Sequence, residues 1–300
     1  MTLITDFLEN SSRNFPEKTA LIFNNSKYTY QELENEVKKK SSFFNKFQKK
    51  SVISLFFENS PEFIISYLGI LKSACVAHII PPNISSNNLY EQISTTNPVS
   101  IITSKELFSK LSIIDIPTIE KIEYSEIKSN LIEERNANES DYAYLIYTSG
   151  TTSKAKGVPI THKNSIFTTN NIVKILKYHS SDVDVLPLPL SHSFGLGCLH
   201  TSISVGSTLV LHKNMVNPEE IFSSINEYSA TTFAAVPSSL TKLIKNELSE
   251  TASVFKNLRL IMTNSTSIPP NIIKEYKKIL KNGIIATYYG LTEASRSTFM

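Results

Sequence analysis

Short β-rich segments alternate with longer helical segments along almost the whole chain of 300 residues. Strand-like segments occur, for example, at residues 52–57, 76–80 and 142–148, and helical segments of about 10–15 residues separate many of the expected strands. Strands separated by helices of this length form parallel βαβ units with right-handed crossovers. The alternation therefore predicts a fold of the α/β class.

Two of the expected helices have well-marked starts. Thr29 is followed three residues later by Glu32, as a capping box requires. Ser60 is followed by Pro61, and this pair suits a helix cap with proline at the first helical position. Both helices are therefore expected to begin at these residues.

The composition is that of an ordinary globular protein, with 41% hydrophobic and 19% charged residues, so intrinsic disorder is excluded. The net charge of +3 arises from 30 basic and 27 acidic residues and gives no reason to expect a nucleic-acid partner. Lysine runs such as residues 38–40 lie beside glutamates, which is typical of a solvated helix face.

The chain shows no signal for secretion or for membrane insertion. Asp6 and Glu9 interrupt the stretch where a signal peptide would need an apolar region. The longest apolar segment, residues 63–71, is shorter than the ~18 residues that a membrane span needs. Cys75 and Cys198 lie far apart and predict reduced, buried thiols. We therefore expect a cytoplasmic protein without a membrane span.

One segment, residues 147–158, has the chemistry of a phosphate-binding loop. It follows an apolar strand and precedes a helix, the place where open α/β sheets bind ligands. Hydroxyl groups, backbone N–H groups around a glycine and lysine ammonium groups can converge on phosphate oxygens. The candidate nucleotide-binding residues are Thr148, Ser149, Gly150, Thr151, Thr152, Ser153 and Lys156. Composition alone leaves a polar surface loop equally open.

The order of residues in this segment is more specific than its composition. It resembles the signature Y-T-S-G-T-T-G-x-P-K-G-V of the AMP-forming adenylate family, which includes acyl- and aryl-CoA synthetases, luciferases and the adenylation domains of peptide synthetases. The chain departs from that signature at Ser153 and Ala155, which change the stiffness of the loop, and it retains Lys156. The resemblance implies that Lys156 is a catalytic residue that offsets phosphate charge.

Residues 289–293 resemble a second motif of the same family, Y-G-x-T-E. The resemblance implies that Tyr289 stacks on adenine, with Gly290 beside it in the nucleotide site. It further implies that Thr292 contacts the α-phosphate and that Glu293 binds Mg²⁺, both as catalytic residues. A carboxylate is a hard oxygen ligand that suits this ion.

Two more segments complete the resemblance. Residues 187–195 are similar to the P-L-x-H-x-F-G stretch of acyl-CoA synthetases, which implies a substrate pocket lined by His192, Phe194 and Gly195, with Val236 from a later apolar stretch. A lone histidine would more often be structural, and the neighbouring motifs favour the pocket. Residues 263–269 follow a strand where the family has an adenine-facing loop, so Asn264 and Ser265 are candidate adenine contacts or simply turn residues.

The resemblance implies two packed α/β subdomains with mostly parallel sheets and helices between them, in αβαβα layers. We expect residues 46–184 to form the subdomain with the phosphate loop, and residues 1–45 plus 185–300 to form the other. The implied reaction uses ATP and Mg²⁺ to convert a carboxylic acid into an acyl-adenylate, whose acyl group then passes to coenzyme A or to the phosphopantetheine thiol of a carrier protein. Residues 190–197 contain no acidic side chain to hold an ammonium group, which favours a fatty or aromatic acid over an amino acid.

The chain ends at Met300, shortly after the Thr-Glu motif. Members of the resembled family continue with an arginine hinge and a C-terminal lid domain that carries a catalytic lysine. The expectation is therefore an incomplete N-terminal domain, truncated before the lid, which is either a piece of a longer enzyme, one part of a split enzyme or a degenerate relative. Alone it is expected to form little or no adenylate, and an acyl carrier protein or a C-terminal domain supplied in trans is a candidate partner. The alternatives are a non-catalytic nucleotide- or acyl-binding remnant and an interaction protein that keeps only the fold.

Overall fold

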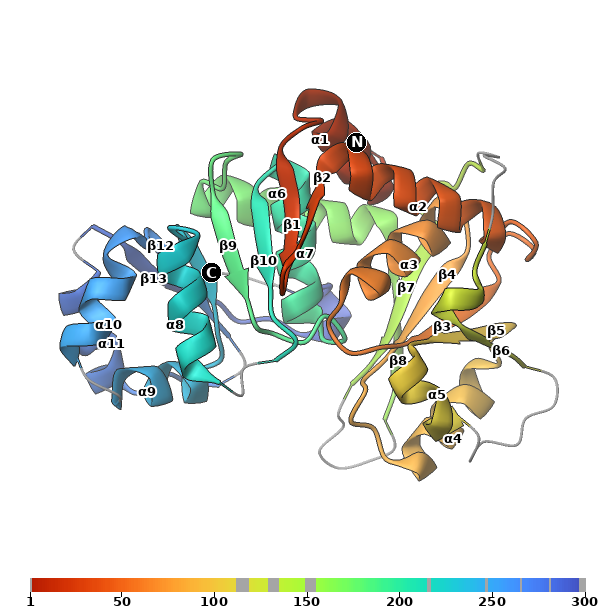
Figure 1. Cartoon of the computed structure of the whole chain (residues 1–300). Helices are drawn as coiled ribbons and strands as arrows, with labels where there is room; N and C mark the ends of the chain where they lie inside the picture. The colour runs from red at the N-terminus through yellow and green to blue at the C-terminus, as the bar shows by residue number, and fades with distance from the viewer. Residues whose placement is uncertain are drawn as a thin grey trace.

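The computed structural model describes residues 2–111, 119–128, 135–148, 155–214, 217–245, 248–264, 266–280 and 282–296. These residues form two β-sheets with helices packed against them, and the first and last strands of the chain belong to the same sheet (Figure 1). Parallel neighbours predominate in both sheets. The predicted α/β class is therefore confirmed.

The larger sheet has seven strands in the order β13-β12-β11-β9-β10-β1-β2. Their bounds are Thr19–Phe23 (β1), Ser26–Thr29 (β2), Val183–Leu186 (β9), Thr208–Leu211 (β10), Thr232–Ala234 (β11), Leu260–Thr263 (β12) and Ile284–Thr287 (β13). β2 is antiparallel to β1, whereas the other neighbours are parallel. The carboxyl ends of β9, β11, β12 and β13 therefore meet along one edge of this sheet.

The second sheet has six strands in the order β6-β5-β3-β4-β7-β8. Their bounds are Val52–Phe56 (β3), Val76–Ile80 (β4), Ser100–Thr103 (β5), Glu120–Glu123 (β6), Tyr142–Tyr147 (β7) and Gly157–Thr161 (β8). β7 and β8 pair in an antiparallel hairpin, and the Thr148 amide donates to the Lys156 carbonyl at 3.0 Å just beyond the paired strands. The division into subdomains at residues 46 and 185 stays a prediction.

Helices connect most of the parallel strands. The α-helices are Thr5–Asn14 (α1), Tyr30–Phe44 (α2), Pro61–Lys72 (α3), Ser86–Thr96 (α4), Lys105–Leu111 (α5), His162–Leu176 (α6), Ser193–Val205 (α7), Pro218–Glu227 (α8), Pro237–Lys245 (α9), Leu248–Val254 (α10) and Pro270–Ile279 (α11). Short 3-10 helices span Tyr124–Glu126 (η1), Phe255–Asn257 (η2) and Thr292–Ala294 (η3). Both expected caps are present, at Thr29 and Ser60. Within the described ranges, no helix has the length and apolar character to span a bilayer.

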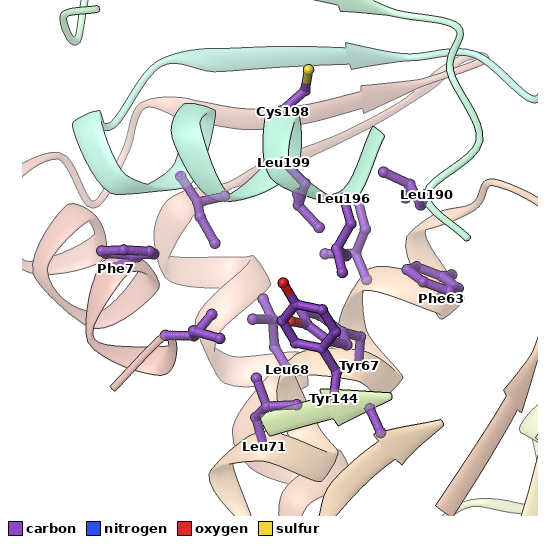
Figure 2. Close-up of a cluster of buried hydrophobic side chains, with 14 of the residues drawn as sticks. Phe7, Phe63, Tyr67, Leu68, Leu71, Tyr144, Leu190, Leu196, Cys198 and Leu199 are labelled. Carbon is purple, nitrogen blue, oxygen red and sulfur yellow. The ribbon is translucent and has the colours of Figure 1, made fainter. Parts of the chain in front are cut away.

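The two sheets share one hydrophobic core, in which α3 and α7 face each other (Figure 2). Leu196 and Leu199 of α7 point toward the side of α3 that carries Tyr67 and Leu68. The Tyr67 hydroxyl forms a 2.9 Å hydrogen bond with Nε2 of His200, also on α7. This continuous core holds the strand ends of both sheets in a fixed relation, which is what a site built from both sheets needs.

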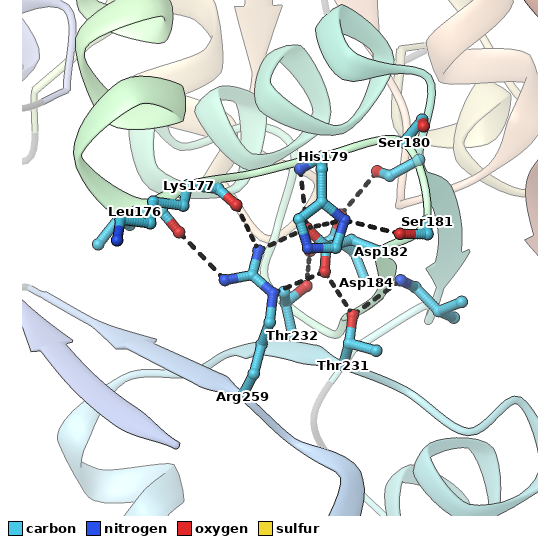
Figure 3. A network of polar contacts seen from close by, with 12 residues as sticks. Leu176, Lys177, His179, Ser180, Ser181, Asp182, Asp184, Thr231, Thr232 and Arg259 are labelled. Carbon is cyan, nitrogen blue, oxygen red and sulfur yellow. Dashed lines mark hydrogen bonds and ion pairs between the residues drawn. The ribbon is translucent and has the colours of Figure 1, made fainter. Parts of the chain in front are cut away.

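A polar network ties together the amino ends of three strands of the larger sheet (Figure 3). The buried Asp182 accepts hydrogen bonds from Arg259 Nε at 2.8 Å and Nη2 at 2.5 Å, and from Thr231 Oγ1 at 2.7 Å. Arg259 also donates to the carbonyls of Leu176 and Lys177, both at 3.1 Å. The network thus joins the end of α6 to the starts of β9, β11 and β12, on the side opposite their carboxyl ends.

Candidate functional site

A pocket of about 590 Å³ lies at the carboxyl ends of strands from both sheets. Its described lining residues are Ile146, Tyr147, Thr148, Leu188, Pro189, His192, Ser193, Phe194, Gly195, Val236, Asn264, Gly290, Leu291, Thr292 and Glu293. They come from the ends of β7, β9, β11, β12 and β13 and from the segments that follow these strands. Parallel α/β sheets bind their ligands at such an edge.

The pocket brings together many of the residues that the sequence predicted. Those that line it are Thr148, His192, Phe194, Gly195, Val236, Asn264, Gly290, Thr292 and Glu293. Eight of them derive from four separate motif segments and Val236 from a later apolar stretch, so the fold gathers segments as far apart as residues 148 and 293 in one cavity. Their roles in binding or catalysis stay predictions.

Other predicted residues do not line this pocket or lie outside the described residues. Lys156 is exposed and lies just before β8, where its carbonyl accepts a hydrogen bond from the Thr148 amide. Tyr289 is 53% exposed and, like Lys156, is not part of the described lining. The predicted residues outside the described ranges are Ser149, Gly150, Thr151, Thr152, Ser153 and Ser265.

His192 caps the start of α7 and faces the pocket. Its amide donates to the Pro189 carbonyl at 3.2 Å, and its carbonyl accepts the first helical bond from Leu196 at 2.9 Å. Although the side chain keeps an exposed surface, the surrounding protein lowers its pKa by desolvation. The imidazole is therefore neutral near pH 7 and can exchange hydrogen bonds with a ligand without adding charge.

Gly195 allows α7 to begin close to the turn that precedes it. A Cβ atom at this position would lie 2.2 Å from the Pro189 carbonyl oxygen, a distance that real Cβ contacts do not reach. The absence of a side chain therefore lets the helix start press against this turn, which presents His192 and Phe194 to the cavity.

An aromatic wall forms one side of the pocket. The buried ring of Phe194 packs edge-on against the ring of Tyr288, with centroids 5.4 Å apart. A side-chain hydrogen bond links Tyr288 to Asn264, which also lines the pocket. The wall is thus apolar at Phe194 and polar at Asn264, a mixture suited to a small ligand with a ring or short chain.

Sequence reasoning missed several residues at or near the pocket. Leu188 and Pro189 lie within a quoted motif, while Ile146 and Leu291 lie beside the residues that motifs singled out. Arg296 belongs to none of the motifs, yet its side chain is almost fully buried next to Phe194. The available signal was its position three residues after Glu293, in a segment that leads directly from the pocket.

Comparison with known proteins identifies the family of the chain. The sequence profile described as "AMP-binding enzyme" matches residues 8–300. The chain therefore belongs to the AMP-binding enzyme family, and the resemblance predicted from its motifs is confirmed.

Individual relatives and solved structures support the assignment. The chain is 27% identical to 4-coumarate–CoA ligase-like 6 of Arabidopsis thaliana over 81% of this chain and 47% of that protein. It is 25% identical to oxalate–CoA ligase of Arabidopsis thaliana over 97% and 61%. The structure of o-succinylbenzoate CoA synthetase from Bacillus subtilis with its acyl-adenylate intermediate shares the fold, with a TM-score of 0.87, 23% identity and coverage of 97% and 59%. The chain thus spans about half the length of the curated relatives that it matches.

Proposed function

We propose that this chain binds ATP and a carboxylic acid in the pocket at its strand ends and contributes to the AMP-forming activation of that acid. The observation that carries the proposal is the convergence of three family motifs on one cavity, through Thr148, His192 and Thr292 with Glu293. The names of the relatives, which are ligases for different acids, support the reaction class and leave the acid open.

The proposed chemistry is an in-line displacement at phosphorus. A carboxylate oxygen of the acid bonds to the α-phosphorus of ATP as the bond to the bridging oxygen breaks, which yields acyl-adenylate and pyrophosphate. In a second step a thiol of coenzyme A or of a carrier protein attacks the acyl carbon, and AMP leaves. The protein has to align the groups and offset phosphate charge, which are tasks for hydroxyls such as those of Thr148 and Thr292 and for the ammonium group of Lys156.

The residues present fit a nucleotide-bound Mg²⁺. Glu293 lines the pocket with an exposed carboxylate. Among the described residues there is no group of three His, Cys, Asp or Glu side chains that could hold a metal by themselves. A single carboxylate suits Mg²⁺, which keeps water and phosphate oxygens as its other ligands. We infer that Glu293 would hold this ion, which would neutralise charge on the phosphates.

The acid and the cellular setting are parts of the same proposal. The pocket lining contains one acidic side chain among its described residues, Glu293, which the proposal assigns to the metal. An acid without an α-ammonium group, aromatic or aliphatic, therefore suits the site better than an amino acid. The buried free thiols of Cys75 and Cys198 support a cytoplasmic location.

Nucleotide binding tests the proposal directly. Titration calorimetry with ATP and Mg²⁺ should show that Lys156→Ala and Glu293→Ala each weaken ATP binding by about tenfold or more, because each removes a charge-assisted contact. The matched controls are Lys278→Ala and Glu219→Ala, which remove exposed charges on α11 and α8. Both controls should bind ATP as the unmodified chain does.

Two results would count against the proposal. Equal ATP affinity in all five proteins would show that the motif residues do not contact the nucleotide. Binding of ATP without pyrophosphate release, even when a lid domain from a family member is added, would favour the alternative of a non-catalytic nucleotide-binding module.

A further inference from the structure

Arg296 places a buried positive charge directly behind the pocket wall. Its side chain is 2% exposed, and the guanidinium carbon lies 5.6 Å from the centre of the Phe194 ring and 5.5 Å from that of Tyr288. Phe194 is itself a lining residue. Phe194 therefore borders the cavity and also lies next to the guanidinium group.

The guanidinium group is surrounded by neutral partners. Nε donates to the Tyr288 hydroxyl at 3.1 Å, and Nη1 donates to Thr201 Oγ1 at 3.0 Å. Among the described residues, the partners of Nη2 are two sulfur atoms, Cys198 Sγ at 3.3 Å and Met262 Sδ at 3.7 Å. Thiol and thioether sulfurs are weak acceptors, so the hydrogen-bonding capacity of Nη2 is poorly satisfied.

No carboxylate among the described residues forms an ion pair with Arg296. Burial raises the pKa of the Cys198 thiol to about 11, so this group is not a thiolate at neutral pH. The buried carboxyl group of Asp184 bonds to Ser207 and Thr232 instead. An arginine stays charged at every physiological pH, and an unpaired buried charge is strongly unfavourable.

The backbone is arranged to hold Arg296 in this position. Ser295 and Arg296 have φ values of 63° and 149°, a conformation that side-chain-bearing residues rarely adopt. The Ser295 hydroxyl is anchored to the Tyr144 hydroxyl at 3.2 Å. On α7, a Cβ atom at Gly197 would lie 2.2 Å from Arg296 Cδ, so a glycine leaves the space for the side chain. Local strain that positions an unpaired charge is typical of a ligand site.

We propose that Arg296 recognises a second anionic group on the acid, a carboxylate at the end remote from the one that is activated. This inference rests on the proposed function, since it concerns the acid that occupies the same pocket. The second carboxylate would supply the negative charge that no described residue gives Arg296, and an oxygen acceptor for Nη2 in place of two weak sulfur acceptors. Because Arg296 is buried next to Phe194, this contact requires the Phe194 ring to turn aside. An aromatic or short aliphatic dicarboxylate fits this description, and a long fatty acid does not.

Acids matched in shape test the proposal. Isophthalate is compared with 3-carbamoylbenzoate, and glutarate with glutaramate, because each pair differs only in the charge of one end. Titration calorimetry of the full chain, with and without ATP and Mg²⁺, should give at least tenfold tighter binding of the dicarboxylate in each pair. Arg296→Met should reduce this preference to less than about twofold, and Arg296→Lys should retain part of it. Arg13→Met, which removes an exposed arginine of α1, should leave the preference as it is in the unmodified chain.

The outcomes separate this inference from the proposed function. Equal binding of both members of each pair, no binding of any dicarboxylate, or an unchanged preference in Arg296→Met would overturn it, even where ATP still binds. Failure to bind ATP with a persisting preference for dicarboxylates would overturn the proposed function alone. A structural role of Arg296 would lower the stability of the variant and leave the ratio of the two affinities unaltered.

Discussion

Two arginines, one partly and one fully buried, lie at opposite ends of the strands of the same sheet. They differ in whether a described carboxylate pairs with the guanidinium group. Arg259, just before β12, forms a two-bonded ion pair with the fully buried Asp182 and two further bonds to backbone carbonyls (Figure 3). Arg296, beyond β13, is more deeply buried, and its partners among the described residues are all neutral. Within the described part of the chain, the charge at the amino ends of the strands has a counter-ion, whereas the charge at the carboxyl ends, beside a cavity, has none.

This difference separates a structural arginine from one suited to a ligand. A buried charge that finds its partner within the fold helps to hold that fold in one arrangement. A buried charge without a partner lowers stability, and such a group persists where an incoming ligand completes it. The comparison can be tested by removing each charge in turn.

The largest effect is expected for Arg259→Met. The substitution leaves the Asp182 carboxylate buried without its counter-ion, so the free energy of unfolding should fall by about 3 kcal/mol at pH 7. Urea unfolding followed by circular dichroism measures this change. Arg13→Met should alter stability by less than about 0.5 kcal/mol because Arg13 is exposed. A loss of under about 1 kcal/mol in Arg259→Met would contradict a structural role for the Arg259–Asp182 ion pair.

A second effect comes from Asp184, the other buried carboxyl group on β9. Burial raises its pKa from 3.8 to about 7, although hydrogen bonds from Ser207 and Ser202 act in the opposite sense. The folded state therefore keeps this proton up to about pH 7, while the unfolded chain releases it near pH 4. The contribution of Asp184 protonation to the free energy of unfolding is therefore fully present below about pH 4 and is lost as the pH rises toward 7.

Asp184→Asn should remove this dependence. The difference in the free energy of unfolding between the variant and the unmodified chain should shift by roughly 2 kcal/mol in favour of the variant from pH 5 to pH 8. Urea unfolding of both proteins at the two pH values measures this shift. Parallel pH profiles for the two proteins would contradict the assignment. Asp184 and Arg296 differ in their chemistry. A buried carboxyl group can become neutral by binding a proton, whereas a guanidinium group stays charged at these pH values.

Two glycines of α7 offer a third test, because they adjoin different kinds of atoms. At Gly195 an added Cβ would meet the Pro189 backbone, which cannot move without shifting the turn, so Gly195→Ala should destabilise the fold by about 1.5 kcal/mol. At Gly197 the added Cβ would meet the side chain of Arg296. Gly197→Ala should therefore cost less in thermal stability, yet displace Arg296 and reduce the preference for dicarboxylates. Equal losses of stability in both variants would show that Arg296 is as firmly held as backbone.

Much of the fold could be predicted because local chemistry marks it. The caps at Thr29 and Ser60 and the alternation of strands and helices are encoded in a few neighbouring residues. The elements that were missed lack such signals. α7 has ten buried residues and two glycines, so it shows no polar face from which helical periodicity could be recognised. β8 and β9 are short and contain a proline and an aspartate, respectively, which are uncommon in strands.

The candidate site divides in the same way. The motifs predicted eight of the nine expected residues that the structure gathers around one pocket, because each motif follows the carboxyl end of a strand, and an apolar stretch predicted the ninth, Val236. Arg296 could not be placed from the sequence, since its environment is made by Cys198, Thr201 and Met262 from distant elements. Whether a charge is paired depends on what the fold brings beside it, and no local pattern encodes that.

The smallest expected effect has the opposite sign from the first. Arg296→Met replaces a buried charge with an apolar side chain of similar length, while Thr201 keeps its bond to the Gly197 carbonyl and Tyr288 keeps its bond to Asn264. The free energy of unfolding in the absence of ligand should therefore rise by about 1 kcal/mol, measured by urea unfolding at pH 7. A decrease comparable to that of Arg259→Met would mean that the fold depends on this charge. A gain in stability together with a loss of dicarboxylate preference would show that the strand ends keep the charge for a ligand at the expense of stability.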